Sequence, residues 1–144
     1  MLYTFDFKKC LILAGPTRLQ GFADGEGLSL ELDDDLYQKE VGADGDVARA
    51  RRHGLAGNGK ITLMQTSPSN DVLMAWAIAD RATNAGVFPL TVKDLLGSTV
   101  IFAPYVWIKK TPVLSLGKEL SNREWMLDIA NTELFIGGNA SMLF

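Results

Sequence analysis

The stretch GNGKITLMQTSPSNDVLMAWAIAD, residues 57–80, decides the fold, because a strand-like half meets a helix-like half inside it. The Asn-Gly pair at 58–59 is a hairpin turn signal, since both residues adopt positive φ at low cost. Residues 60–66 alternate as a half-buried strand does, with Ile61 and Leu63 on one face. A tight turn and a strand are therefore predicted ahead of the Ser-Pro-Ser-Asn-Asp junction.

A helix is predicted directly after this junction. Pro68 breaks the strand, and Ser69 or Asn70 can act as the N-cap by accepting a hydrogen bond from a free backbone N–H group. Residues 72–79 are all apolar, so we expect the helix to be covered over a broad face. The Asn-Ala-Gly sequence at 84–86 can end the helix with a residue in the left-handed conformation.

Further strands are predicted on both sides of this stretch. Residues 2–9 alternate between an aromatic and a mostly polar face, and the strand continues through residue 14. Residues 28–33 place three leucines on one face, which fixes the register, because a slip of one residue would turn all three to water. The later strands are predicted at residues 89–94, 98–110 and 122–136, with Pro104 marking an edge or a bulge in the second of them.

Several strands with one helix predict a mainly β fold with one α-helix, built as a β-sandwich or a partly open barrel. The chain has 144 residues, which fits a single domain over residues 1–144. A domain of this size buries roughly 68–70% of the surface of its unfolded chain, so it needs no disulfide or metal to fold.

Residues 33–59 form a polar, Gly-rich segment that is far longer than the usual connection of about 4–6 residues. The Asp-Gly pair at 44–45 predicts a two-residue hairpin turn, so we expect an extended hairpin arm that stands off the body. Its outgoing half is mostly acidic, apart from Lys39, and its returning half is basic. Such an arm cannot bury much of itself, and it is either disordered or ordered by a partner.

The composition argues against several classes of function. The net charge of −3 and the pI of about 5.1 argue against a nucleic-acid-binding protein, which needs a basic surface. The single cysteine, Cys10, excludes an intrachain disulfide, and its apolar surroundings favour a small core side chain over a reactive thiol. The run from Cys10 to Ala14 is too short to span a membrane, and residues 1–10 lack the pattern of a signal peptide, so a cytoplasmic protein is expected.

No catalytic, cofactor or metal site is predicted. His53 is the only histidine and lies in the arm, where it is expected to be solvated rather than part of a catalytic arrangement. The sequences DGEG and ADGD lack the ligand pattern of a calcium loop, and GLAGNGK lacks the spacing of a phosphate loop. The acidic run at 33–35 is interpreted as a solvated charge cluster. The sequence therefore does not predict an enzyme.

What remains is a pattern typical of assembly. Unpaired sheet edges recruit another chain unless they are guarded, and a closed ring of identical subunits removes every edge at once. The charged arm and the apolar end SMLF at 141–144 have no obvious place in a monomer core. The physical reading leaves open a simpler alternative, in which the arm is a floppy loop and the end of the chain is frayed.

Five segments resemble the tail tube proteins of bacteriophages with contractile tails. They are GFADGEG (21–27), VGADGDVARAR (41–51), LMQTSPSND (63–71), VKDLLGST (92–99) and REWMLDIAN…FIGGN (123–139). The resemblance covers nearly the whole chain, residues 3–139, and leaves the apolar end unmatched. It carries no enzymatic motif, so it implies no catalytic residue.

The resemblance implies a structural role in the virion tail, with synthesis in the cytoplasm of the bacterial host. Tube proteins form hexameric rings that stack into a hollow cylinder, and each subunit adds strands to a ring-wide inner β-barrel. A hairpin arm reaches the adjacent ring, the sheath wraps the outside, and the tube starts at a baseplate. The tape-measure protein fills the lumen before DNA passes, without specific binding of the DNA. The tube protein of type VI secretion shares this plan.

On this picture the helix is pinned against the outside of the sheet, and the other sheet face is left for the lumen. Glu31 and Asp33 lie opposite the leucine face and are the lumen candidates, although they could equally face the sheath. Fixed carboxylates there would repel DNA phosphates within a Debye length of ~8 Å. The candidate inter-ring residues of the arm are Asp34, Asp35, Tyr37, Lys39, Glu40, Asp44, Asp46, Arg49, Arg51 and Arg52.

Two alternative functions stay open at this point. A tube-capping or baseplate protein on the same fold would form discrete rings but no filaments. A monomeric β-sandwich that binds a small ligand would stay monomeric at all concentrations, and proteases would remove its arm without consequence.

Overall fold

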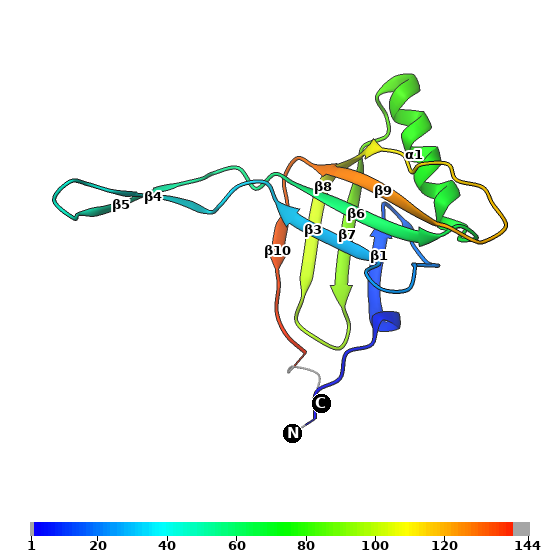
Figure 1. Cartoon of the computed structure of the whole chain (residues 1–144), viewed down its shortest axis with the longest axis horizontal. Coiled ribbons are helices and arrows are strands. Elements are labelled where there is room, and N and C mark those ends of the chain that lie inside the picture. Colours follow the sequence, from blue (N-terminus) through cyan, green and yellow to red (C-terminus); the bar gives the residue numbers. More distant parts are fainter. Residues whose placement is uncertain (1, 140–144) are drawn as a thin grey trace.

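A bent antiparallel sheet surrounds one hydrophobic core in the computed structural model, which describes residues 2–139 (Figure 1). The sheet order is β2-β1-β7-β8-β9-β6-β3, with β10 also paired to β8, and β4-β5 form a separate two-stranded sheet. Across residues 2–139 the large sheet does not close on itself, so the predicted mainly β fold with one helix is confirmed as a partly open sandwich. The strands are β1 (Cys10–Ala14), β2 (Thr17–Arg18), β3 (Leu28–Leu32), β4 (Tyr37–Val41), β5 (Val47–Arg51), β6 (Gly57–Met64), β7 (Phe88–Asp94), β8 (Val100–Lys110), β9 (Asn122–Ile129) and β10 (Glu133–Phe135); the helices are η1 (Phe7–Lys9), a 3-10 turn, and α1 (Ser69–Thr83).

Strand β8 forms the bend of the sheet. Its pairing with β7 shifts register between the partners Ala103 and Val106, and Pro104 lies in this shift, where no ladder N–H is needed. The predicted bulge is therefore confirmed. It divides the sheet into two parts, which cross steeply in Figure 1. We call β3, β6, β9 and residues 106–110 of β8 the arm-bearing half-sheet, and we call β1, β2, β7, β10 and residues 100–103 of β8 the opposite half-sheet.

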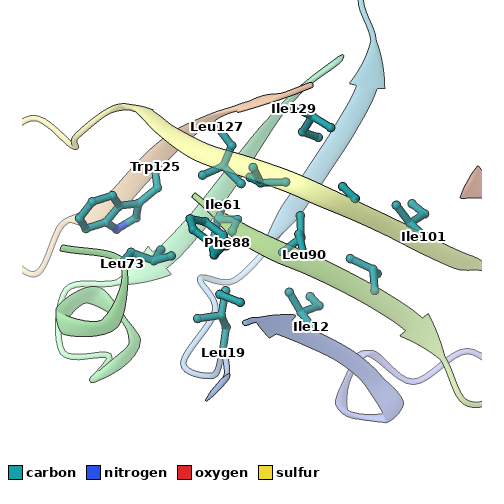
Figure 2. Close-up of a cluster of buried hydrophobic side chains, with 14 of the residues drawn as sticks. Ile12, Leu19, Ile61, Leu73, Phe88, Leu90, Ile101, Trp125, Leu127 and Ile129 are labelled. Carbon is teal, nitrogen blue, oxygen red and sulfur yellow. The ribbon is translucent and has the colours of Figure 1, made fainter. Parts of the chain in front are cut away.

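The core lies between the inward faces of these two half-sheets (Figure 2). The alternation read from the sequence places the right residues inside: Ile61 and Leu63 of β6, Leu90 of β7 and Leu127 of β9 are all fully buried. Phe88 is the largest fully buried side chain. The leucines of β3 are only partly buried, because β3 is an edge strand, but Leu28 and Leu30 still pack against the core.

The Ser-Pro-Ser-Asn junction fixes α1 by long-range hydrogen bonds. The Asn70 side chain donates to the carbonyl oxygens of Met64 (2.9 Å) and Ser67 (3.0 Å), and its Oδ1 accepts the indole N–H of Trp125 at 3.0 Å. Ser69 Oγ accepts the backbone N–H of Gln20 at 2.8 Å. The prediction of Ser69 or Asn70 as N-cap is therefore wrong, because Pro68 holds the cap position without a side-chain bond. The two polar side chains instead tie the helix to strand β9 and to the segment after β2.

Helix α1 closes one end of the core and does not lie against the outside of the sheet. Only a narrow stripe of it, including Leu73 and Ala77, is buried, whereas Met74 and Ile78 are 41% and 57% exposed. The expected broad cover is therefore wrong, because the helix meets the sheet edge-on beside Phe88 and Trp125 (Figure 2). The helix ends as predicted, with Asn84 in the left-handed conformation at φ 59°.

The predicted strand at residues 2–9 is wrong. Tyr3 and Phe5 are more than half exposed, and residues 7–9 form the 3-10 turn η1. Strand β1 pairs with β7 only from Cys10 to Ala14, because β7 ends opposite Cys10 at Asp94. A strand is formed by backbone hydrogen bonds to a neighbouring strand, so an alternating sequence without such a neighbour does not become one.

The Asn-Gly pair at 58–59 lies inside β6 and does not form a turn, so this prediction is also wrong. A Cβ on Gly57 would collide with the carbonyl oxygen of Glu31, and one on Gly59 would collide with the side chain of Leu30. These glycines allow the close approach of β3 to β6. Close approach of another backbone is a common reason for glycine inside a strand.

The predicted strand at 122–136 is divided into β9 and β10 by residues 130–132. Both strands pair with the same edge of β8, and they lie on either side of the bulge at Pro104. The backbone N–H of Ala130 donates to Tyr105 O at 3.0 Å, where the chain passes from β9 to β10. The apolar end at 141–144 lies outside the described residues.

Candidate assembly surfaces

The hairpin arm is built from β4 and β5, paired from Tyr37↔Arg51 to Val41↔Val47, and it projects away from the rest of the molecule (Figure 1). Every residue of both strands is exposed, as the sequence predicts. The turn differs from the predicted two-residue type. The N–H of Gly45 donates to Gly42 O, and within the turn at 42–46 only Gly45 has positive φ, at 88°. This is a three-residue loop that ends in a left-handed glycine.

The register of the arm gives its two faces different charges. Residues directly opposite each other share a face, so Lys39, Arg49 and Arg51 lie together on one face, which we call the cationic face. The Arg49 guanidinium stacks over the Tyr37 ring of that face at 4.1 Å from its centroid. The opposite face carries Gln38, Glu40, Ala48, Ala50 and Arg52. Its two charged residues lie beside neutral ones, because Glu40 is opposite Ala48 and the Arg52 guanidinium donates to Gln38 Oε1.

The separation of charge between the two faces of the arm is not visible in the sequence. Along the sequence, the acidic residues fall mostly in the outgoing half of the arm and the basic residues in the returning half. Apart from Glu40, which lies in β4 on the opposite face, the acidic arm residues lie at the two ends of the hairpin. Asp34 and Asp35 are exposed at its root, and Asp44 and Asp46 are exposed at its tip. The like-charged pair Lys39↔Arg49 is unfavourable in an isolated hairpin, so a carboxylate-rich partner would stabilise the cationic face.

The outward face of the arm-bearing half-sheet carries both lumen candidates. Glu31 lies opposite Asn58, which in turn lies opposite Asp128. The Asn58 side-chain amide donates to Asp33 Oδ1 at 2.9 Å. The structure therefore groups Glu31, Asp33 and Asp128 around one amide. Asp128 was missed from the sequence, because only the register of β6 with β9 brings residues 31 and 128 together.

The arm-bearing half-sheet has an open backbone edge at each side. The N–H of Asp33 donates to Ala56 O and the N–H of Thr62 donates to Gly27 O, so odd-numbered residues along β3 bond to β6. The backbone groups of Leu28, Leu30 and Leu32 therefore face the open side. At the other side, β7 pairs with β8 only as far as Phe88↔Val106, so within the described chain residues 107–110 have no strand partner on that side, although helix α1 contacts β8.

The other candidate groups in residues 2–139 are His53, Cys10 and possible clusters of metal-ligating side chains. His53 is exposed in the arm, and burial raises the pKa of the Cys10 thiol, with Asp94 and Asp6 raising that pKa further, so the thiol is protonated at neutral pH. In residues 2–139 no group of three or more His, Cys, Asp or Glu side chains could hold a metal ion. No helix within the same residues has the length and apolarity needed to cross a membrane.

Comparison with solved structures identifies the fold. The cap that terminates the tube of the anti-feeding prophage superposes with a TM-score of 0.65 at 10% identity, covering 94% of this chain and 93% of that one. The sheath/tube terminator of an extracellular contractile injection system, PVC, gives a TM-score of 0.63 at 11% identity over 94% and 99% of the two chains. The PVC sheath-tube complex gives 0.63 at 11% identity over 92% of each chain.

Sequence comparison identifies the family. Structural protein ORF10 of Pseudomonas phage KPP10 is 30% identical over 123 residues, which are 84% of this chain and 71% of that protein. The family model for the bacteriophage PhiTE tail tube protein matches residues 15–137, from the end of β1 to just beyond β10. The chain therefore belongs to the PhiTE tail tube protein family of bacteriophage structural proteins.

Proposed function

We propose that this protein forms the inner tail tube of a contractile phage tail by stacking hexameric rings, and that it acts as a conduit for DNA without any catalytic activity. The observation that carries the proposal is the arm-bearing half-sheet, which combines an arm, an outward face and two edges without a strand partner. Pairing of β3 in one copy with residues 107–110 of the next would close a ring-wide β-barrel and leave no edge.

The outward face of that half-sheet would then line the lumen, and α1 at the end of the core would be remote from it. The sheath would cover the outside of the tube, and the tape-measure protein would occupy the lumen until DNA replaces it. A baseplate would nucleate the tube. The arm would reach the adjacent ring, with its charged residues setting the register more than the affinity, since exposed ion pairs are worth only ~0–1 kcal/mol each.

Negative-stain electron microscopy of the purified chain over a range of concentrations, with and without baseplate extract, tests this proposal. Hollow filaments or stacked rings are the expected result. A monomer under every condition would contradict it and would favour a ligand-binding β-sandwich.

A tube-terminating cap is the second candidate, because two of the solved structures with the same fold are described as a cap and a terminator. The cap differs from the tube in stopping growth. It predicts discrete rings that never extend and that bind to the ends of tubes made by another protein. The family match to a tail tube protein favours the tube over the cap.

Charge reversal in the lumen gives a separate prediction. We expect tubes of Glu31→Lys, Asp33→Lys protein to assemble but to deliver DNA roughly ten-fold or more less efficiently, because fixed cations would concentrate and hold phosphates. The measurement is DNA ejected per tailed particle in virions built with the variant. Glu133→Lys is the matched control, since Glu133 is exposed on the opposite half-sheet and should leave delivery unchanged. Equal delivery by both variants would remove Glu31 and Asp33 from the lumen.

A further inference from the structure

The connection between β8 and β9, residues 111–121, exposes four large apolar side chains. Val113, Leu114, Leu116 and Leu120 are 77%, 70%, 71% and 67% exposed. Contiguous exposed apolar side chains of this kind mark an interaction site. The loop is anchored at its base, where the Ser121 N–H donates to Gln65 Oε1 at 3.1 Å and Ser121 Oγ donates to Ser115 O at 3.1 Å. It therefore presents its apolar residues from a defined position.

A hollow of about 360 Å³ lies at the base of this loop. Val113 forms part of its wall, together with Glu124 and Met126 from the outward face of β9. A hollow can receive an inserted side chain, which a flat loop cannot. Its complete lining is Lys110, Thr111, Val113, Asn122, Glu124 and Met126.

The arm and this loop lie at opposite ends of the arm-bearing half-sheet (Figure 1). Strand β6 starts beside Leu32 at the root of the arm and ends with Met64 paired to Asn122, directly after the loop. Copies arranged along the strand direction would therefore bring the arm of one copy toward the loop of the next. A contact between two different surfaces of the same chain repeats from copy to copy without limit, as a stack requires.

The tip of the arm and the loop end are complementary in chemistry. The paired Val41 and Val47 at the tip are 58% and 66% exposed, and the acids Asp44 and Asp46 lie in the turn between them. The loop end carries apolar side chains and three exposed lysines, Lys109, Lys110 and Lys118, which outnumber its two exposed acids, Glu119 and Glu124. The apolar side chains of the two ends can therefore pack against each other, and the carboxylates of the tip can lie near the lysines of the loop end.

We propose that the loop at 111–121 receives the arm tip of the next copy in the stack, with Val41 and Val47 against its apolar residues and Asp44 and Asp46 toward its lysines. This contact rests on the proposed tube function and specifies where the inter-ring arm ends.

Cysteine cross-linking of assembled tubes tests the contact. In a Cys10→Ser background, Val47→Cys is combined in turn with Val113→Cys, Leu114→Cys, Leu116→Cys and Leu120→Cys. Oxidised tubes of at least one pair should give a ladder of covalent multimers on a non-reducing gel, because each chain links to the next. The matched controls carry the cysteine at the tip or in the loop alone, and they should give no ladder.

A charge swap provides the second measurement. Asp44→Lys with Asp46→Lys should raise the critical concentration for tube formation about ten-fold, since rim charges of like sign repel. Adding Lys110→Asp and Lys118→Asp to the same chain should restore it. Tubes without any cross-linked ladder, or a swap without rescue, would overturn the contact while leaving the tube function intact. Failure of the unmodified chain to form tubes under any condition would contradict both the contact and the tube function.

Discussion

Deletion of residues 37–54 is expected to leave a folded protein that no longer stacks. Every residue of β4 and β5 is exposed and none belongs to the hydrophobic core, so their loss removes no core contact. The deletion leaves residues 34–36 and Leu55 to connect the bonded pair Asp33 and Ala56, which is enough for a tight loop. Because loop-closure entropy changes slowly with length, the free energy of unfolding should change by only about 1 kcal/mol.

Thermal unfolding and electron microscopy of the same sample measure the two parts of this expectation. Rings or monomers with a wild-type unfolding transition would support the arm as the stacking element. Ala48→Ser with Ala50→Ser, on the face of the arm opposite the cationic face, is the control that keeps the arm and should stack normally. Tubes of normal length from the deletion variant would show that stacking does not depend on the arm.

Substitution of Gly57 by valine is expected to have the largest effect on stability. Gly57 lies between Leu32 of β3 and Ile129 of β9, and its new Cβ would meet backbone atoms of β3 that cannot rotate away. Overpacking of this kind costs about 3 kcal/mol. The strain would separate β3 from β6, and with it displace Glu31 and the outgoing strand of the arm, so tubes should be lost as well.

Gly54→Val is the matched control, because a Cβ at Gly54 meets no atom within 4 Å and its conformation does not require glycine. Urea unfolding of both variants measures the difference in stability, and electron microscopy measures assembly. Equal unfolding midpoints for the two variants would mean that the close approach of β3 to β6 does not limit stability.

The sequence by itself determined the elements whose signals are local. Alternation placed Ile61 and Leu63, and likewise Leu90, on buried faces, because side-chain direction in a strand repeats every two residues whatever its partner is. Asn84 ends the helix because asparagine tolerates the left-handed conformation, and Pro104 marks the bulge because proline has no backbone N–H to donate. Both are properties of the single residue. The exposure of the arm also followed from its composition alone.

Only the tertiary structure decided which residues meet. The aromatic alternation at 2–9 had no strand to pair with, and the glycines at 57 and 59 serve the approach of β3 rather than a turn. The cationic face of the arm and the grouping of Glu31 with Asp128 depend on strand register, which is set by contacts between residues far apart in the chain. Local propensity carries no information about those distances, so surfaces that register creates could be found only in the folded molecule.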